Sequence, residues 1–113
     1  MNMTTKRGVN MVIELTKENF KETISNSDKL VLVDFWAEWC SPCLRYTPIL
    51  KALDEEVAGQ AVIAKLEVDS APEIADQYEI LSIPTTIIFK NGEIVDQFVG
   101  IKSKDELKKR LGL

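Results

Sequence analysis

The chain has 113 residues, a length that fits one compact domain with a sizeable buried core. Hydrophobic residues make up 45% and charged residues 28%, and the net charge of −4 leaves no basic surface for binding nucleic acid. Histidine is absent, which excludes catalysis by a Cys–His or Ser–His pair and any metal site that uses histidine.

The first ten residues are polar, and we expect them to form a flexible extension ahead of a single domain over residues 11–113. They contain Lys6 and Arg7 but no apolar stretch of the kind found in signal peptides. Apolar runs elsewhere in the chain fall short of the ~20 residues that a membrane span needs. We therefore expect a cytoplasmic protein that does not insert into a membrane.

The first half of the domain shows two strand patterns and one short helix pattern. Met11–Leu15 is an apolar run that predicts the first strand. Thr16 is placed to cap a helix in which Phe20 and Ile24 form the apolar stripe. Leu30–Ala37 is almost continuously apolar, which is typical of a central strand covered on both faces.

A longer helix and a third strand follow. The helix is expected to begin at or directly after Cys40, because Pro42 is tolerated in a first helical turn. Gly59 predicts its end, since glycine readily adopts the left-handed conformation that closes a helix. Ala61–Val68 then predicts the third strand.

Two segments have the spacing of a capping box, in which a serine at the start of a helix is followed three residues later by glutamate. Ser70 and Glu73 predict a short helix that runs toward Tyr78. Ser103 and Glu106 predict the last helix.

The strands Thr85–Lys90 and Glu93–Val99 are joined by Asn91-Gly92, a strong signal for a type I′ hairpin turn. The element order is therefore β-α-β-α-β-α-β-β-α. The first three strands, which are joined through helices, should run parallel, and the final hairpin should be antiparallel. The sequence thus predicts an α/β fold with one central mixed β-sheet, parallel strands plus an antiparallel C-terminal hairpin, flanked by helices on both faces.

The chain holds two cysteines, within Trp39-Cys40-Ser41-Pro42-Cys43, at the junction between the most apolar strand and a helix. The positive partial charge of a helix N-terminus stabilises a thiolate at Cys40, and thiolate is the nucleophile of disulfide exchange. Cys43 lies one turn further on, close enough to attack a mixed disulfide. These features favour a redox-active dithiol over half of a shared metal site, an inert disulfide or two buried thiols. We expect no metal and no bound cofactor.

Asp34 is the one charged residue in the apolar run of the central strand. Burial would raise its pKa, and a carboxyl that titrates near neutrality below a dithiol can exchange protons with Cys43. The alternative is a solvated carboxylate at the end of a strand. Lys65 lies mid-strand and either faces Asp34 or extends to solvent. Trp39 is either a core side chain or, as its edge position favours, an exposed platform for a client protein.

The sequence resembles the thioredoxin family from Met11 to the C-terminus. Several separate motifs carry the resemblance in the family's order: Val31, Asp34–Cys40, Pro42-Cys43, Pro48–Leu50, Asp69, Ile83–Thr85, Phe89–Gly92 and Val99-Gly100. The resemblance implies the thioredoxin fold and the activity of a protein-disulfide reductase. It also implies disulfide-containing client proteins and a separate thioredoxin reductase as partners. We expect the protein to act as a monomer.

The resemblance also assigns roles to individual residues. It implies that Cys40 is the attacking thiol, that Cys43 is the resolving thiol, and that Asp34 is a buried acid–base group with Lys65 as its partner. It implies a cis peptide bond before Pro84, which places that loop against the dithiol. The client chain would lie along an apolar groove lined by Trp39, Ser41, Pro42, Ile83, Val99 and Gly100.

Three positions depart from the family pattern. Ser41 replaces the usual glycine, Leu44 replaces a residue that is often basic, and Leu81-Ser82 replaces an Arg/Gly-like pair. Because about 30 mV changes a dithiol equilibrium tenfold, the Ser41 hydroxyl can shift the redox poise. Two alternatives therefore stay open: a disulfide isomerase or oxidase, and a non-catalytic module that binds partners in the groove.

Overall fold

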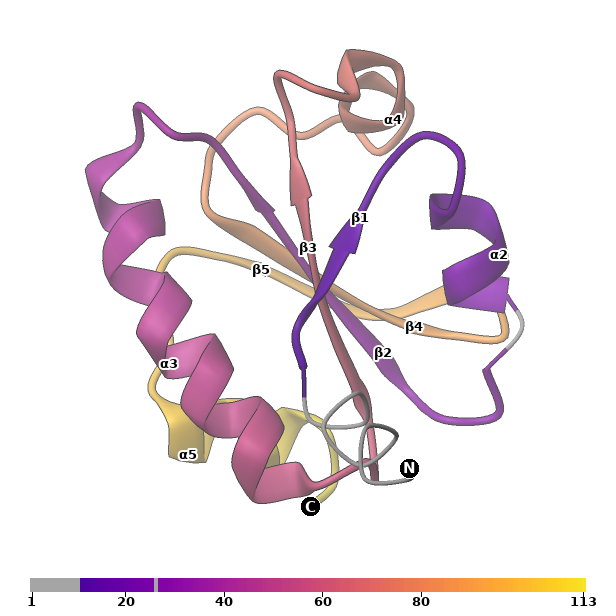
Figure 1. Ribbon diagram of the computed structural model, residues 1–113, viewed down its shortest axis with the longest axis vertical. Coiled ribbons are helices and arrows are strands. Elements are labelled where there is room, and N and C mark those ends of the chain that lie inside the picture. The colour runs from indigo at the N-terminus through magenta and orange to yellow at the C-terminus, as the bar shows by residue number, and fades with distance from the viewer. Residues whose placement is uncertain (1–10, 26) are drawn as a thin grey trace, which may run out of the picture.

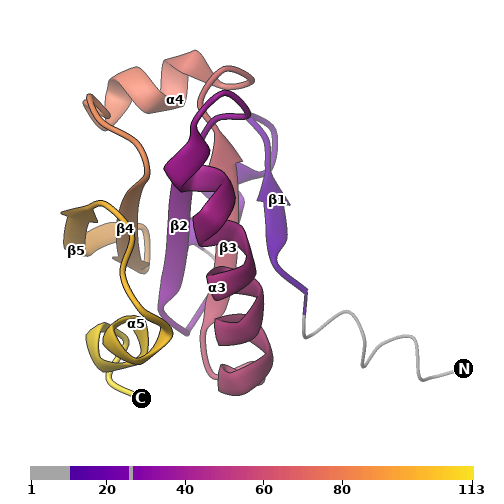
Figure 2. The same ribbon diagram turned by 90° about the vertical axis from the view of Figure 1, so that its left-hand side faces the viewer.

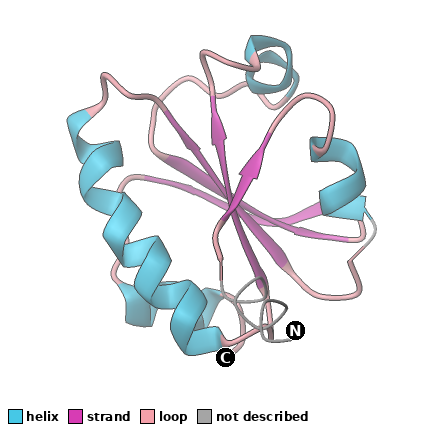
Figure 3. Cartoon of the chain, in the orientation of Figure 1, coloured by secondary structure: helices cyan, strands magenta, loops and turns pink. Residues whose placement is uncertain are grey.

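The computed structural model describes residues 11–25 and 27–113, and the predicted N-terminal extension, residues 1–10, lies outside the described residues. The elements follow the predicted order. They are β1 (Ile13–Leu15), α2 (Phe20–Ser25), β2 (Val31–Trp36), α3 (Ser41–Val57), β3 (Val62–Glu67), α4 (Pro72–Gln77), β4 (Thr85–Lys90), β5 (Glu93–Val99) and α5 (Lys104–Arg110). Figure 3 shows these helices and strands along the chain.

The strands form one mixed sheet with the order β1-β3-β2-β4-β5, so β2 lies at its centre. β3 pairs in parallel with both β1 and β2, whereas β4 pairs antiparallel with β2 and β5. This arrangement confirms the predicted sheet. The apolar character of β2 is explained by its central position, because β3 and β4 flank it in the sheet and both of its faces are covered, so that its side chains are shielded from water.

Helices cover both faces of the sheet (Figure 1). α2 and α4 pack against one face through Phe20, Ile24 and Ile74. α3 and α5 pack against the other, where the buried helical residues are Tyr46, Leu50, Leu53, Val57, Leu107 and Leu111. Figure 2 shows α3 lying over β2 and β3. Side chains alternate along β2, so Val33 points toward α2 and Asp34 lies on the face that α3 covers.

The helix ends agree with the sequence in part. Thr16 Oγ1 accepts a hydrogen bond from the Asn19 N–H at 3.3 Å and so caps the turn that leads into α2. At the end of α3 the left-handed cap is Ala58, with φ of 47°, one residue before the predicted stop at Gly59.

Only one of the two predicted capping boxes caps its helix. Ser103 Oγ accepts a hydrogen bond from the Glu106 N–H at 3.1 Å, as a capping serine does. The short helix predicted to run toward Tyr78 is α4, but Ser70 does not cap it, because α4 begins at Pro72 and its cap position is Ala71, which provides no side-chain acceptor. The Ser70 hydroxyl instead donates to the Glu67 carboxylate at 2.9 Å.

The β4–β5 hairpin turn is the predicted one. Asn91 and Gly92 both have positive φ, 52° and 82°, as a type I′ turn requires. The Gly92 N–H donates to the Ile24 carbonyl at 2.8 Å, which fixes the hairpin to the end of α2. A Cβ at Gly92 would stand 3.1 Å from Ser25 Oγ, so this close approach also favours glycine.

Candidate active site

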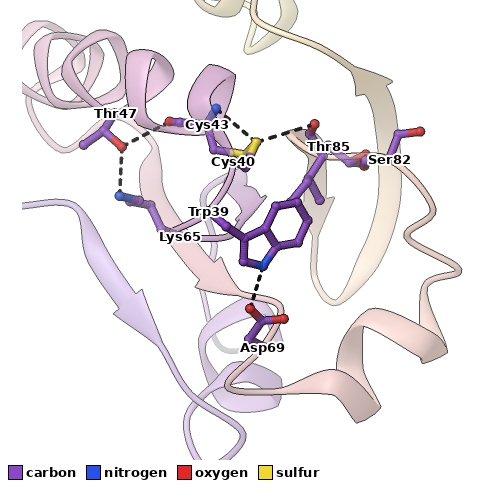
Figure 4. The surroundings of a disulfide bond; sticks show 9 residues. Trp39, Cys40, Cys43, Thr47, Lys65, Asp69, Ser82 and Thr85 are labelled. Atoms are coloured by element: carbon purple, nitrogen blue, oxygen red, sulfur yellow. Dashed lines mark hydrogen bonds between the residues drawn. A yellow bond between two sulfur atoms is a disulfide. The ribbon is translucent and has the colours of Figure 1, made fainter.

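A disulfide bond joins Cys40 and Cys43 at the start of α3, directly beyond the carboxyl end of β2 (Figure 4). Cys43 is fully buried, whereas Cys40 retains a small exposed area. The Cys43 N–H donates to Cys40 Sγ at 3.2 Å. A donor in this position stabilises negative charge on the Cys40 sulfur when the bond is reduced, because helix-terminal N–H groups favour a thiolate.

The loop before β4 closes over the disulfide. The peptide bond between Ile83 and Pro84 is cis, the isomer that the family resemblance implies. The Ile83 carbonyl oxygen lies 3.8 Å from Cys40 Sγ. The Gly100 N–H donates to the Pro84 carbonyl at 2.8 Å, so the end of β5 holds this loop in place. The loop and the disulfide thus form one surface although they lie more than 40 residues apart.

Trp39 is exposed over 69% of its surface, so it is a surface side chain and not a core one. Its indole N–H donates to Asp69 Oδ2 at 2.8 Å, which fixes the ring beside the disulfide (Figure 4). The sequence placed Asp69 among the family motifs but did not reveal this hydrogen bond, because the two residues are 30 positions apart.

The other predicted groove residues lie around the disulfide with mixed exposure. Val99 and Ser41 are exposed, while Pro42, Ile83 and Gly100 are half-buried. Two of the residues that depart from the family pattern are exposed leucines, Leu44 over 50% and Leu81 over 95% of its surface.

Asp34 is completely buried on β2. Its register partners are Lys65 on β3 and Thr86 on β4, which places the three side chains on the same face of the sheet. Burial raises the pKa of Asp34 to about 7, the Lys65 ammonium opposes that rise, and Glu14 adds to it. Neither carboxyl oxygen has a hydrogen-bond partner among the described residues. The carboxyl group is therefore buried rather than solvated, and it changes charge near neutral pH.

Lys65 is also buried, but it does not hydrogen-bond to Asp34. Its ammonium donates to Thr47 Oγ1 at 3.1 Å and lies 4.1 Å from the centre of the Trp36 ring. Of the two alternatives drawn from the sequence, extension to solvent is wrong because Lys65 is buried, and Lys65 lies opposite Asp34 in the sheet without a hydrogen bond to it. Lys65 acts on Asp34 through its charge, across the sheet, while its hydrogen bond goes to α3 (Figure 4).

A second polar pair lies under α3. The hydroxyls of Tyr46 and Thr86 are 3.1 Å apart and buried, and burial raises the pKa of Tyr46 to about 12. This pair was not identified from the sequence. The available signal was a tyrosine in the buried stripe of α3, because a buried hydroxyl needs a partner.

Disulfide exchange is the chemistry that this arrangement suits. Cys40 retains exposed area, Cys43 is fully buried, and a carboxyl that titrates near neutrality is buried in β2, the strand that leads to the two cysteines. The fold and the site together define a thiol–disulfide oxidoreductase. Within the described ranges, no helix is long and apolar enough to cross a membrane.

Comparison with known proteins agrees with this class. The model of the thioredoxin family matches residues 11–112. The chain is 50% identical over 98 residues to the thioredoxin of Chlorobaculum thiosulfatiphilum, an alignment that covers 87% of this chain and 91% of that one. It is 48% identical over 99 residues to the thioredoxin of Chlamydia trachomatis serovar D, covering 88% and 94%. A bifunctional thioredoxin reductase/thioredoxin of Mycobacterium leprae is 41% identical over 109 residues, which cover 96% of this chain and 24% of that protein.

The chain belongs to the thioredoxin family. Its activity is that of a protein-disulfide reductase, carried by the Cys40–Cys43 pair.

Proposed function

We propose that the protein reduces disulfide bonds of cytoplasmic client proteins, with Cys40 as the attacking thiol and Cys43 as the resolving thiol. The Cys40 thiolate attacks one client sulfur, a mixed disulfide forms, and the other client sulfur leaves as a thiolate. The Cys43 thiolate then attacks Cys40, which releases the second client thiolate and leaves a Cys40–Cys43 disulfide. Two electrons pass from the protein dithiol to the client.

The difference between the two sulfurs carries this assignment. Cys40 retains exposed area, accepts the Cys43 N–H bond and faces the Ile83 carbonyl, whereas Cys43 is fully buried behind it. A nucleophile must meet the client and be stabilised as a thiolate, and Cys40 satisfies both requirements. Cys43 needs access only to the sulfur of Cys40.

Asp34 serves in this proposal as the proton acceptor when the Cys43 thiol ionises, and as the donor in the reverse reaction. Its burial and its pKa of about 7 support this role, because a general base works best when its pKa lies near the working pH. Lys65 sets the charge around the carboxyl and does not itself reach the sulfurs in this scheme.

The client chain lies along the cis-proline loop in this proposal. Pro84 holds Ile83 against Cys40, and the exposed Trp39 ring provides an apolar platform. The remaining groove residues are Ser41, Pro42, Val99 and Gly100. Extended client segments with apolar side chains fit such a surface.

A separate thioredoxin reductase returns the disulfide to the dithiol, so the protein carries electrons and contributes to redox homeostasis. The Mycobacterium leprae relative supports this partner, because its name joins a thioredoxin reductase and a thioredoxin in one chain. We further propose that the protein acts as a monomer in the cytoplasm, without a metal or a bound cofactor.

Insulin reduction with dithiothreitol as electron source tests the proposal. The wild-type protein is expected to accelerate the reaction, and Cys40→Ser should reduce the rate to that of dithiothreitol alone. An unchanged rate in Cys40→Ser would contradict the catalytic assignment and favour a binding module.

Equilibration with glutathione tests the direction of electron flow. A reductase is expected to show a potential near the value of about −270 mV known for thioredoxins. Ser41, an exposed residue between the two cysteines in the chain, is the feature that favours an isomerase or oxidase instead. A potential near about −120 mV, as in strong oxidants, would support that alternative, and Ser41→Gly would show how much of it the serine causes.

A further inference from the structure

Lys65 is buried and lies opposite Asp34 in the sheet, although the two residues are 31 positions apart along the chain. The two close contacts of its ammonium are with other residues. Its hydrogen bond goes to Thr47 Oγ1 at 3.1 Å, and its charge rests 4.1 Å from the centre of the Trp36 ring. A cation over the face of an indole is attracted by the ring electrons. Both contacts draw the ammonium away from a hydrogen bond with Asp34.

Thr47 links this lysine to the resolving cysteine. It lies one turn after Cys43 on α3, and its hydroxyl donates to the Cys43 carbonyl at 3.4 Å while accepting from Lys65. A hydroxyl has one proton to donate and two lone pairs to accept, so the two bonds are compatible. Figure 4 shows the Thr47 and Lys65 side chains pointing toward each other beside the disulfide.

The packing around Lys65 does not by itself fix the ammonium. Glu14, Thr47, Lys51 and Lys65 line a cavity of about 320 Å³ between β1 and α3, so the lysine borders open space on one side. In such a position, a specific hydrogen bond and a ring contact decide where the charge rests.

We propose that Thr47 is a positioning residue that, together with Trp36, holds the Lys65 ammonium off the Asp34 carboxyl. An ammonium that hydrogen-bonds to a carboxylate favours its charged form and lowers its pKa by about 1–3 units. Keeping the two groups apart therefore leaves the carboxyl able to change charge in the neutral range. The inference deepens the proposed function, since it matters for exchange if Asp34 takes up the Cys43 proton.

The other groups around Asp34 do not take over this role. Glu14 on β1 is the register partner of Lys65, and its negative charge raises the pKa of Asp34. The Tyr46 hydroxyl on α3 is already bonded to Thr86 on β4. Lys51, one turn beyond Thr47 on α3, lines the cavity beside Lys65. Of these groups Lys65 is the cation that acts on Asp34, so its position sets the attraction.

The test measures the pKa of Asp34 by carbon-13 NMR of its carboxyl group in the oxidised protein, where the cysteines do not titrate. Thr47→Val keeps the shape of the side chain and removes the hydroxyl. We expect the pKa of Asp34 to fall by about one unit in Thr47→Val as Lys65 turns to the carboxyl. Thr47→Ser retains the hydroxyl and should restore the wild-type pKa.

Lys65→Met provides the decisive control. The effect of Thr47→Val should vanish when Lys65 is already absent, because no ammonium remains to be released. An unchanged or higher pKa in Thr47→Val, or a fall of equal size in the Lys65→Met background, would overturn the proposal. Thr47→Ala gives a second reading with the same expected fall if the valine variant does not fold.

This readout is independent of the proposed function. The oxidised protein performs no exchange during the titration, so a change in the pKa of Asp34 that depends on Lys65 reports the position of the ammonium and not the exchange chemistry. Loss of insulin reduction in Cys40→Ser tests the exchange chemistry separately. The experiments can therefore refute the positioning role of Thr47 without refuting the catalytic scheme, and the reverse.

Discussion

The two ends of α3 differ in the side chains that are exposed around them. At its N-terminal end, the apolar Trp39 ring is exposed while the charged side chains of Asp34 and Lys65 are buried. At its C-terminal end, Leu53 is buried in the same cluster as Leu107 of α5, in the ordinary manner. The same helix thus connects a region with an exposed aromatic side chain to a region in which the large apolar side chains are buried.

Charged groups differ between the ends only in part, because Asp54, near the C-terminal end of α3, is buried as well. Near the end of α3, Glu56 forms ion pairs at the surface with Lys104, at 2.6 Å, and with Lys108. Lys65, by contrast, is buried without a carboxylate partner for its hydrogen bond. Natural proteins break local rules mainly at functional sites and compensate elsewhere. The comparison teaches that the α3–α5 end stabilises the fold while the disulfide end is kept reactive at some cost in stability.

Asp34→Asn should have the largest effect on the difference between the two ends, because it removes a buried ionisable group and so stabilises the disulfide end. The pKa of Asp34 is about 7 in the folded protein, against an ordinary value of 3.8. The folded protein therefore holds a proton that the unfolded chain releases between about pH 4 and pH 7, so its stability falls as pH rises through that window. Three pKa units correspond to roughly 4 kcal/mol, and asparagine does not ionise.

Urea denaturation of the two oxidised proteins between pH 4 and pH 8 measures this effect. The free energy of unfolding of Asp34→Asn should exceed that of the wild-type protein by up to about 4 kcal/mol at pH 8, and the difference should disappear near pH 4. Asp76→Asn, on the exposed side of α4, is the matched control and should not reproduce the gain. A pH-independent difference would refute the buried-carboxyl account. The same variant should also slow release of the client from the mixed disulfide.

Leu107→Ala should act on the opposite end and in the opposite direction. Leu107 belongs to α5 and is fully buried in the cluster that α5 forms with α3 and the sheet. Removing a buried leucine side chain costs about 3 kcal/mol through lost burial and the cavity left behind. The unfolding midpoint in urea should fall accordingly, while insulin reduction by the folded protein stays at the wild-type rate. A selective loss of activity would show that the two ends are less separate than we infer.

Ser103→Ala should have the smallest effect on stability among these variants. Ser70→Ala is its matched control. The Ser103 hydroxyl caps α5, and its removal is expected to cost about 1 kcal/mol. Ser70→Ala removes a serine with the same sequence spacing that caps no helix, so its cost should stay within about 0.5 kcal/mol. Equal losses in thermal or urea denaturation would contradict the difference between the two serines.

Much of the fold could be predicted from the sequence because its signals are local. The apolar run Leu30–Ala37 indicated a central strand, and Asn91-Gly92 fixed the position of the hairpin turn. The Ser70 prediction failed for a local reason as well. Both Ser70 and Pro72 are signals for a helix start, and the proline set the start one residue too late for the serine to cap it.

The site was predictable only as far as its motifs extend. The cysteines and Asp34 stand in one stretch of the chain, whose residues alone left open whether the carboxyl is buried, and the family resemblance implied the burial that the structure shows. The partners of Lys65 could not, because Thr47 and Trp36 come from different elements and meet only after the sheet and α3 have packed. The same holds for the Tyr46–Thr86 pair, which joins residues 40 positions apart.

The most direct test of the central claim is to trap the mixed disulfide. Reduced Cys43→Ser is mixed with an oxidised client such as insulin, and the adduct is mapped by mass spectrometry after digestion without reductant. Our account predicts a stable adduct at Cys40, since the resolving thiol is gone, and no accumulation of adduct in the wild-type protein. Failure of Cys43→Ser to form the adduct, with capture of the client through Cys43 in Cys40→Ser instead, would contradict it.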